Sequence, residues 1–356
     1  MAILASIIIP YHHIAAQQSP LESPVGGATG VSSSIPGKYV VDLGPVGIAV
    51  NLKTNIVYVS GGLSNTTYII EKSETYSLGK SFFYLIDSKT NSVVNTLLLA
   101  GLPGIVAVNP NTNMVYMPNY GSNTTYVIDG KTSSVVKTVN VGSTPFAVAV
   151  NPNTNMVYVA NELPNTTSVI DGKTNSVVKT IHIRGTPFAE AVNPNTNMVY
   201  VANYGSNTTS VIDGKTNTIV ADIKIGRFLS GVAVNPVTNT IYVSSVEPTA
   251  LSVIDGKTNS VVKSIKVGMG PAGVAVNPST NMIYVANTFS NTTSVIDGKT
   301  NSVVKTINVG IGPTSIAIDM FRNVVYVTNE DSKTVSVIDG KTNTLVKTIT
   351  IKNTGI

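Results

Sequence analysis

The chain has 356 residues, of which 42% are apolar and only 12% are charged, and its formal net charge is +5. The positive charge is spread over the chain without a basic run or a basic-aromatic cluster, which argues against nucleic-acid binding. The absence of cysteine excludes disulfides, iron–sulfur clusters and thiolate zinc sites, and three histidines (His12, His13, His182) cannot build a histidine-rich metal centre. We therefore expect no metal and no cofactor.

The first 37 residues differ in composition from the rest. Residues 1–9 are apolar, but this run is too short to span a bilayer, and no Lys or Arg precedes it. Followed by Ile14, Ala15 and Ala16, the run favours a truncated or weak signal peptide over residues 1–16, against a buried edge strand or a disordered tail. Residues 17–37 are rich in Ser, Pro and Gly, as is typical of a linker. An exported protein without a transmembrane span is expected, with its folded domain at residues 38–356.

Most of the remaining chain is an internal repeat of 42 residues. An aspartate in the phrase Val-Ile-Asp-Gly-Lys-Thr-Asn recurs at this interval, at Asp87, Asp129, Asp171, Asp213, Asp255, Asp297 and Asp339. An asparagine in the phrase Ala-Val-Asn-Pro also recurs, at Asn51, Asn109, Asn151, Asn193, Asn235 and Asn277, with Asp319 in the last unit. The first interval of this second marker is 58 residues, so the first unit holds an insertion of 16 residues. A unit of this length cannot bury its own faces and must stack on its neighbours.

The third unit, residues 145–183, predicts four short strands. They are expected at 146–150, 156–160, 167–170 and 177–181, separated by polar turns at 151–155, 163–165 and 171–175. The last strand alternates as a more exposed strand does, and nothing of helical period is left over. The sequence therefore predicts an all-β fold, a seven-bladed β-propeller of four-stranded antiparallel blades with a 42-residue repeat.

The second predicted strand carries a recognisable signature. It reads Tyr-Val-Thr-Asn at 326–329 and Tyr-Val-Ala-Asn at 158–161, 200–203 and 284–287, and departs from this at Gly61 and Ser245. With Gly-x-x-Pro before the first strand and Asn-Pro-x-Thr-Asn after it, the chain resembles the YVTN β-propeller repeat family over about residues 45–351. This resemblance implies an exported or surface-layer protein of archaea or bacteria.

Residues 38–43 read like an eighth outer strand before the first unit. This segment is expected to lie at an edge beside the last blade or to lead loosely into the ring. Alternatively, a terminal strand pairs with the sheet edge of another protomer, which would allow self-association.

Five Asn-Thr-Thr sequons occupy one position of the repeat, between the second and third strands. Their asparagines are Asn65, Asn123, Asn165, Asn207 and Asn291. They are candidate N-glycosylation sites if the protein is exported. The alternative is an Asn- and Thr-rich turn that duplication has copied. Units five and seven lack the sequon, which leaves Glu247, Glu330 and Asp331 in a sector without sugar as candidate partner-binding residues.

Glu190 is the most discordant residue of the repeat, because the other six units have Val or Ile at its position. An unpaired buried carboxylate would be costly, so we expect it to be protonated, hydrated or paired. An ion pair with Arg184 or Arg227 is favoured over a ligand-contacting site in the central channel.

The insertion lies at about residues 68–84 and is rich in aromatic residues. It is expected to form a hairpin that either projects from the ring or packs on its own blade. If it projects, Tyr68, Tyr76, Phe82 and Phe83 are candidate contacts for a partner.

No nucleophile, base and orienting residue stand together in the sequence. The repeated aspartates lie beside a lysine, so a tight turn is favoured over a calcium loop. We expect a non-catalytic structural or interaction module at the cell surface, with a protein or a glycan as partner. The alternatives are a hydrolase or lactonase-like enzyme that uses Glu190, and a docking domain of an envelope redox complex.

Overall fold

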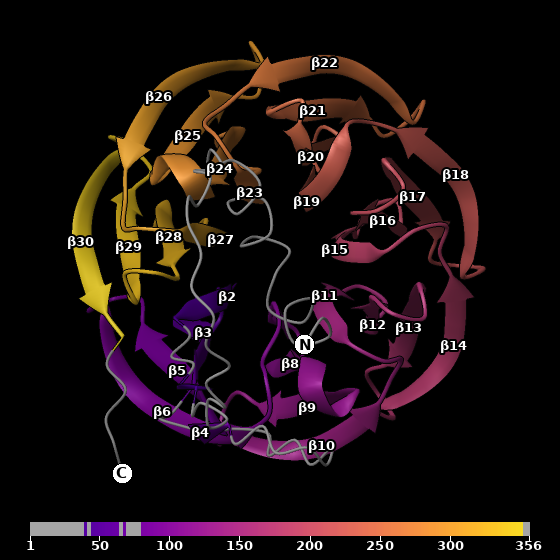
Figure 1. Cartoon of the computed structure of the whole chain (residues 1–356), viewed down its shortest axis with the longest axis vertical. Helices are drawn as coiled ribbons and strands as arrows, with labels where there is room; N and C mark the ends of the chain where they lie inside the picture. Colours follow the sequence, from indigo (N-terminus) through magenta and orange to yellow (C-terminus); the bar gives the residue numbers. More distant parts are fainter. Residues whose placement is uncertain (1–38, 41–43, 64–66, 69–79, 352–356) are drawn as a thin grey trace, which may run out of the picture. The chain divides into compact units, whose positions relative to one another are not determined.

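Seven four-stranded antiparallel sheets form a ring (Figure 1). The computed structural model describes residues 39–40, 44–63, 67–68 and 80–351. Within each sheet the strands follow one another from the centre of the ring to its rim in chain order. The predicted all-β, seven-bladed propeller is therefore confirmed.

Each blade contributes one strand to each of four concentric layers. The innermost strands are β2 (Pro45–Asn51), β7 (Ala107–Asn109), β11 (Pro145–Asn151), β15 (Pro187–Asn193), β19 (Arg227–Asn235), β23 (Pro271–Asn277) and β27 (Pro313–Asp319). The second strands are β3 (Ile56–Leu63), β8 (Met114–Asn119), β12 (Met156–Asn161), β16 (Met198–Asn203), β20 (Thr240–Glu247), β24 (Met282–Asn287) and β28 (Val324–Asn329).

The two outer layers complete the blades. The third strands are β5 (Lys80–Asp87), β9 (Thr124–Asp129), β13 (Thr166–Asp171), β17 (Thr208–Asp213), β21 (Ala250–Asp255), β25 (Thr292–Asp297) and β29 (Thr334–Asp339). The strands at the rim are β6 (Ser92–Ala100), β10 (Ser134–Asn140), β14 (Ser176–His182), β18 (Thr218–Lys224), β22 (Ser260–Lys266), β26 (Ser302–Asn308) and β30 (Thr344–Thr350).

Two short 3₁₀ turns, η1 (Tyr120–Ser122) and η2 (Thr288–Ser290), follow β8 and β24. Among the described residues, no helix is long and apolar enough to cross a membrane.

The repeated aspartate closes the turn between the third and fourth strands. Oδ1 of Asp129 accepts hydrogen bonds from the backbone amides of Lys131 (2.7 Å) and Thr132 (3.3 Å). The asparagine that ends this turn adopts a left-handed backbone, as at Asn175 (φ 50°) and Asn301 (φ 51°), which asparagine tolerates better than most residues. The aspartate is thus a turn residue, as predicted.

The core lies between the blades rather than within them. One cluster of buried apolar side chains fills each contact between neighbouring blades, here called a joint. Every joint receives the fully buried tyrosine of one second strand: Tyr58, Tyr116, Tyr158, Tyr200, Tyr242, Tyr284 and Tyr326. Stacking is therefore the source of stability in this ring, as expected of a repeat that cannot bury its own faces.

The tyrosine of one blade explains the glycine of the next. A Cβ on Gly172 in blade 3 would lie 2.8 Å from Oη of Tyr116 in blade 2 and 2.6 Å from Oδ1 of Asn155. Contacts this short do not occur, so the Asp-Gly turn must present bare backbone to its neighbour. At six of the seven joints the glycine of the repeated phrase is thus a packing requirement, whereas blade 1 has Ser88 at this position.

The ring closes without exchanging a strand between the chain ends. The last blade holds its own four strands, β27 to β30, and packs directly on blade 1 through a shared apolar cluster. The segment read as an eighth outer strand contributes β1 (Tyr39–Val40), which pairs with β4 (Thr67–Tyr68) in a separate two-stranded sheet. The expectation that it extends the edge of the last blade is therefore wrong.

Candidate functional site

The Asn-Thr-Thr turns lie on the ring face that also carries the connections between blades. The amide of Glu162, at the turn after β12, donates to the carbonyl oxygen of Thr144 in the connection to blade 3 (3.1 Å). The amide of Thr144 in turn donates to Oδ1 of Asn123 in blade 2 (3.1 Å). The turns and the connections therefore form one continuous surface.

The sequon asparagines within the described residues are exposed and have a left-handed backbone. This holds for four sites, which have φ values of 57°, 50°, 60° and 53°: Asn123, Asn165, Asn207 and Asn291. Asn65 lies outside the described residues. Because asparagine is favoured at a left-handed turn position, the fold alone accounts for this residue type.

The amides of these asparagines are oriented in two ways. Oδ1 of Asn123 and Oδ1 of Asn291 each accept a backbone hydrogen bond from the connection to the next blade, from Thr144 (3.1 Å) and Gly312 (3.0 Å). The amide nitrogen of Asn165 instead lies 2.9 Å from the carbonyl oxygen of Glu162 and 3.1 Å from that of Gly185. The nitrogen of Asn165, which is the atom that would carry a glycan, is therefore engaged within the fold.

The first threonine of each sequon also has a structural role. Its hydroxyl accepts a hydrogen bond from the asparagine that ends the second strand, as in Asn161 to Thr166 (3.1 Å) and Asn203 to Thr208 (3.2 Å). Blade 7, which has no sequon, retains this bond between Asn329 and Thr334 (3.1 Å). The fold therefore accounts for this residue with or without a sequon.

The second threonine of the sequon is different, because its hydroxyl is buried without a partner in three of the four described units. The residues concerned are Thr125, Thr209 and Thr293. In the two units without a sequon, Leu251 and Val335 occupy the same strand position and are equally buried. A buried hydroxyl without a partner costs about 1–3 kcal/mol, so packing favours the apolar residue. The fold gives no reason for this threonine.

The fourth such threonine, Thr167, bonds Glu190. Its hydroxyl donates to Oε1 of Glu190 in the next blade at 2.7 Å, while Oε2 has no hydrogen-bond partner. Burial raises the pKa of Glu190 to about 8, and the Thr167 hydrogen bond opposes this to a smaller degree. Glu190 is therefore a buried, protonated acid at neutral pH.

The ion pair expected for Glu190 is not formed among the described residues. Arg227 pairs with Glu247 at 3.5 Å, and both side chains are largely exposed; Arg184 is exposed as well. The prediction was wrong because Arg184 lies in the connection before β15 and Arg227 is the exposed first residue of β19, whereas Glu190 is in the middle of β15 and faces the joint. Protonation, one of the three expected outcomes, accommodates its burial instead.

Two of the aromatic residues proposed as partner contacts are buried in the ring. Phe83 stacks on Tyr58 and Phe82 on Tyr84, with ring centroids 5.8 Å apart in both pairs. Both belong to β5, which is the third strand of blade 1. The prediction that these phenylalanines contact a partner is therefore wrong. Tyr68 lies in β4, and Tyr76 lies outside the described residues.

Glu330 and Asp331 lie at the sequon-free turn of blade 7. Asp331 is exposed. Burial, followed by the charge of Asp331, raises the pKa of Glu330 to about 7. Sequence reasoning missed a similar acid, Glu162, whose pKa burial raises to about 7 beside Tyr120. It occupies the same turn position as Glu330, so comparing that column of the repeat would have found it.

A row of aromatic side chains crosses blades 3 to 5 on the face of the Asn-Thr-Thr turns. Phe146 stacks on Phe188 (4.6 Å between centroids), Phe188 lies 5.7 Å from Tyr204, and Tyr204 lies 5.2 Å from Phe228. The guanidinium of Arg227 lies 5.1 Å from the centroid of the Phe228 ring, within cation–π range.

Phe228 has a left-handed backbone, with φ 54°. Blades 6 and 7 place Gly270 and Gly312 at the corresponding position, also with positive φ. A left-handed conformation is a true outlier for a bulky residue and marks a constraint worth testing for function. Blade 3 places Thr144 there, also with a positive φ (51°), so the left-handed backbone belongs to this position of the repeat and the residue types in the column gave no signal for Phe228.

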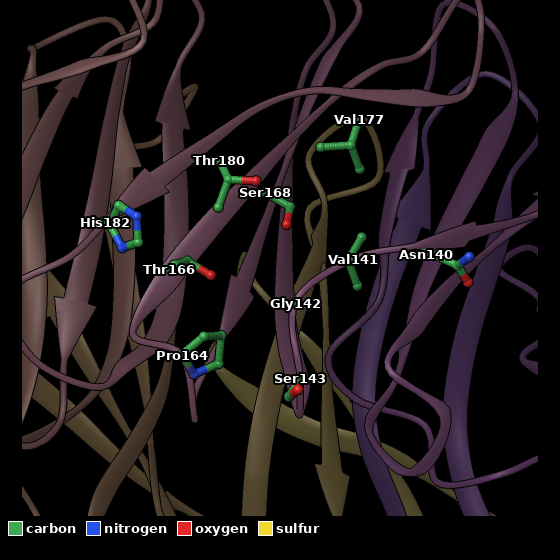
Figure 2. A pocket seen from close by; sticks show the side chains of 10 residues that line it. All are labelled: Asn140, Val141, Gly142, Ser143, Pro164, Thr166, Ser168, Val177, Thr180 and His182. Carbon is green, nitrogen blue, oxygen red and sulfur yellow. The ribbon is translucent and has the colours of Figure 1, made fainter.

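A groove of about 440 Å³ lies between blades 2 and 3 (Figure 2). Its lining comes from the end of β10 and the connection after it, and from β13, β14 and the turn before β13: Asn140, Val141, Gly142, Ser143, Pro164, Thr166, Ser168, Val177, Thr180 and His182. Thr166 and Ser168 turn their hydroxyls toward the groove (Figure 2), whereas Thr167 between them faces Glu190, because side chains alternate along a strand. The groove and Glu190 therefore lie on opposite faces of β13. Within the part of the chain that the structure describes, no group of three metal-ligating side chains is found.

Comparison with known proteins agrees with this architecture. A hydrazine synthase structure from Kuenenia stuttgartiensis is similar, with a TM-score of 0.70 and 18% identity over 89% of this chain and 99% of that chain. At this identity the similarity concerns the fold alone. No curated protein matches the chain. The sequence profile of the YNCE-like beta-propeller family matches residues 94–354, which is most of the chain. The protein therefore belongs to the YNCE-like beta-propeller family.

Proposed function

We propose that this protein is an exported, N-glycosylated propeller that acts as a non-catalytic interaction module at the cell surface, as its resemblance to YVTN repeat proteins implies. A closed propeller supports an interaction or structural role. The proposal of export and N-glycosylation depends on one observation: the hydroxyls at the third position of the Asn-Thr-Thr sequons are buried without a hydrogen-bond partner.

The sequon asparagine and this threonine occur together in the described units. Where the turn asparagine is present, as at Asn123, Asn207 and Asn291, a threonine follows two residues later although its hydroxyl is buried without a partner. Where the turn has another residue, as in blades 5 and 7, the position is apolar. N-glycosylation requires Ser or Thr at this position, so recognition of the sequon supplies the reason that packing does not. The exposed asparagines would carry the sugars on one ring face.

A non-catalytic role is supported by the position of Glu190. Its carboxyl group is buried in a joint against Thr167, and it does not line the groove between blades 2 and 3. A protein or glycan partner would then bind the surface of the ring rather than an acid-lined reaction site.

Mass spectrometry of the protein purified from its native host tests the proposal. We expect a mass above that of the polypeptide by whole glycan units, loss of Met1, and glycopeptides at Asn123, Asn207 and Asn291. Occupancy at Asn165 should be lower, because its amide nitrogen is engaged with two carbonyl oxygens. An unmodified mass with Met1 retained would contradict both export and glycosylation.

Two variants of one threonine separate its effect on glycosylation from its effect on the stability of the fold. Thr209→Ser keeps the sequon, and we expect it to keep the glycan at Asn207. Thr209→Val removes the sequon and the partnerless hydroxyl, so it should lose that glycan while unglycosylated protein from a bacterial host becomes more stable by about 1 kcal/mol. A stability loss in Thr209→Val would show that the fold needs this hydroxyl and would remove the argument for glycosylation.

A further inference from the structure

The joint between blades 7 and 1, here called the closing joint, differs from the other six. At each of the six, the asparagine that ends an innermost strand donates its side-chain amide to the Oδ1 of a turn asparagine in the next blade, at 2.6–2.7 Å. In the first of these pairs Asn51 donates to Asn113. The six joints thus have the same polar contact at the same place.

Three departures from the repeat meet at the closing joint. Asp319 stands where the other units have the donor asparagine, Arg322 stands where they have threonine, and Ser88 stands where they have the glycine of the Asp-Gly turn. Nη1 of Arg322 lies 2.8 Å from Oδ2 of Asp319, 3.1 Å from Oγ of Ser88 and 2.6 Å from Oδ1 of Asn55. The Ser88 hydroxyl also donates to Oδ2 of Asp319 at 3.2 Å. Residues more than 230 positions apart therefore form one network.

The network depends on all three residues. Asp319 is 1% exposed, whereas the Arg322 side chain is 31% exposed, so Arg322 is the cation that balances a buried carboxylate. Removing one partner of a buried pair is strongly destabilising because the other charge remains uncompensated. Oδ1 of Asn55 accepts its hydrogen bond from Arg322. At the other joints the turn asparagine accepts this bond from the asparagine that ends the innermost strand, as Asn113 does from Asn51.

Ser88 is incompatible with the contact found at the other six joints. There, a Cβ on the turn glycine would lie 2.5–2.7 Å from Oδ1 of the turn asparagine, as between Gly130 and Asn113. If blade 1 packed on any other blade, for example on Asn277 of blade 6, its Asn55 would have to take the orientation that Asn113 has. The Cβ of Ser88 would then clash with the Asn55 side chain. At the closing joint, Oδ1 of Asn55 accepts a hydrogen bond from Arg322 instead, and Ser88 donates to Asp319.

We propose that Ser88, Asp319 and Arg322 make blade 7 the only blade on which blade 1 can close, which specifies a ring of seven among near-identical repeat surfaces. The attraction between Asp319 and Arg322 favours the correct joint, and the side chain of Ser88 disfavours closure on an internal blade. Specificity between related partners commonly needs both an attractive and a repulsive element.

The test compares refolding of full-length variants from denaturant at micromolar concentration, followed by size-exclusion chromatography with light scattering. The triple variant Ser88→Gly/Asp319→Asn/Arg322→Thr gives the closing joint the contact of the other six. We expect its folded monomer to keep a Tm near that of the parent, while the fraction of oligomeric or expanded species after refolding rises at least threefold. A refolded fraction of closed monomer equal to that of the parent would overturn the proposal.

Two variants with fewer substitutions keep the test decisive if the triple variant folds poorly. Arg322→Thr should lower the Tm by roughly 5–10 °C, because it leaves the Asp319 carboxylate buried and unpaired. Adding Asp319→Asn to that variant should restore most of the loss. The matched control is Thr280→Arg, the same turn position in blade 6, where Asn277 offers no carboxylate and Gly340 of blade 7 offers no hydroxyl; it should not raise the Tm. An unchanged Tm in Arg322→Thr, or no rescue by Asp319→Asn, would contradict the network.

Discussion

The hydroxyl of Thr167 lies 2.7 Å from Oε1 of Glu190 and joins blade 3 to blade 4 inside the core. The equivalent threonines of blades 2, 4 and 6 face Val or Ile across their joints and have no partner. Glu190 thus supplies an acceptor to a polar group that the repeat otherwise leaves unsatisfied. The same contact makes the stability of this joint dependent on pH.

Glu190→Gln should remove a pH dependence of folding. The folded pKa of about 8 lies above the ordinary value of 4.5, so the native state holds a proton that the unfolded chain releases. Stability from this group is fully present below pH 4.5 and is lost as the pH rises to 8, at about 1.4 kcal/mol per pH unit. Chemical denaturation at several pH values measures this. Equal slopes for Glu190→Gln and the parent between pH 5 and 8 would contradict the buried, protonated state.

Glu190→Val should leave the Tm at pH 8 unchanged or raise it. It removes a buried carboxyl group that has one unpartnered oxygen, and it gives this joint the side chain of its neighbours. Thr167→Val should instead destabilise by about 1–3 kcal/mol, because it removes the one hydrogen bond that the Glu190 carboxyl group makes among the described residues. The double variant should be at least as stable as Glu190→Val. A double-variant cycle by thermal denaturation gives the coupling, and additive effects would argue against the Thr167–Glu190 bond.

Gly172→Ala should destabilise the ring by about 1–3 kcal/mol through overpacking. The new methyl group would lie within 2.8 Å of Asn155 and of Oη of Tyr116, neither of which is free to move in the joint. Gly205→Ala is the matched control, because the nearest atom to its Cβ is Oγ1 of Thr186 at 3.3 Å. It should change stability by less than about 0.5 kcal/mol. Similar losses in both variants would show that the joint is not tightly packed at the glycine.

Phe228→Ala should be less stable than Phe228→Gly by about 1 kcal/mol. Both variants lose the contact with Tyr204, but only alanine keeps a Cβ in the left-handed backbone. At an ordinary position outside the left-handed region alanine is the more stable residue, so the order of the two variants reports the backbone conformation directly. Urea denaturation of the two proteins decides it, and alanine being the more stable would place Phe228 outside the left-handed region.

The fold could be predicted because each signal recurs in phase. In the third unit the strand bounds are confirmed to within one residue, since Asn151 and Asp171 mark the turns themselves. Contacts between blades were harder to predict from the sequence. Glu190 was assigned an arginine partner because charge alone suggested it, whereas strand alternation and blade order bring it to Thr167. Phe82 and Phe83 were counted with the insertion, as part of a hairpin that either projects or packs on its own blade, although counting back from Asp87 places both in a core strand.

Because every blade is built from consecutive strands, the ring can assemble in the order of synthesis. Each sheet can complete its hydrogen bonds once its own four strands have left the ribosome, without waiting for a strand from the other end of the chain. Only the contacts between blades 7 and 1, among them the one between Asp319 and Ser88, must wait for the final blade. A growing chain would thus carry an open arc whose last step is a single docking event. Whole blades could be added or removed during evolution as long as the two ends that meet are kept.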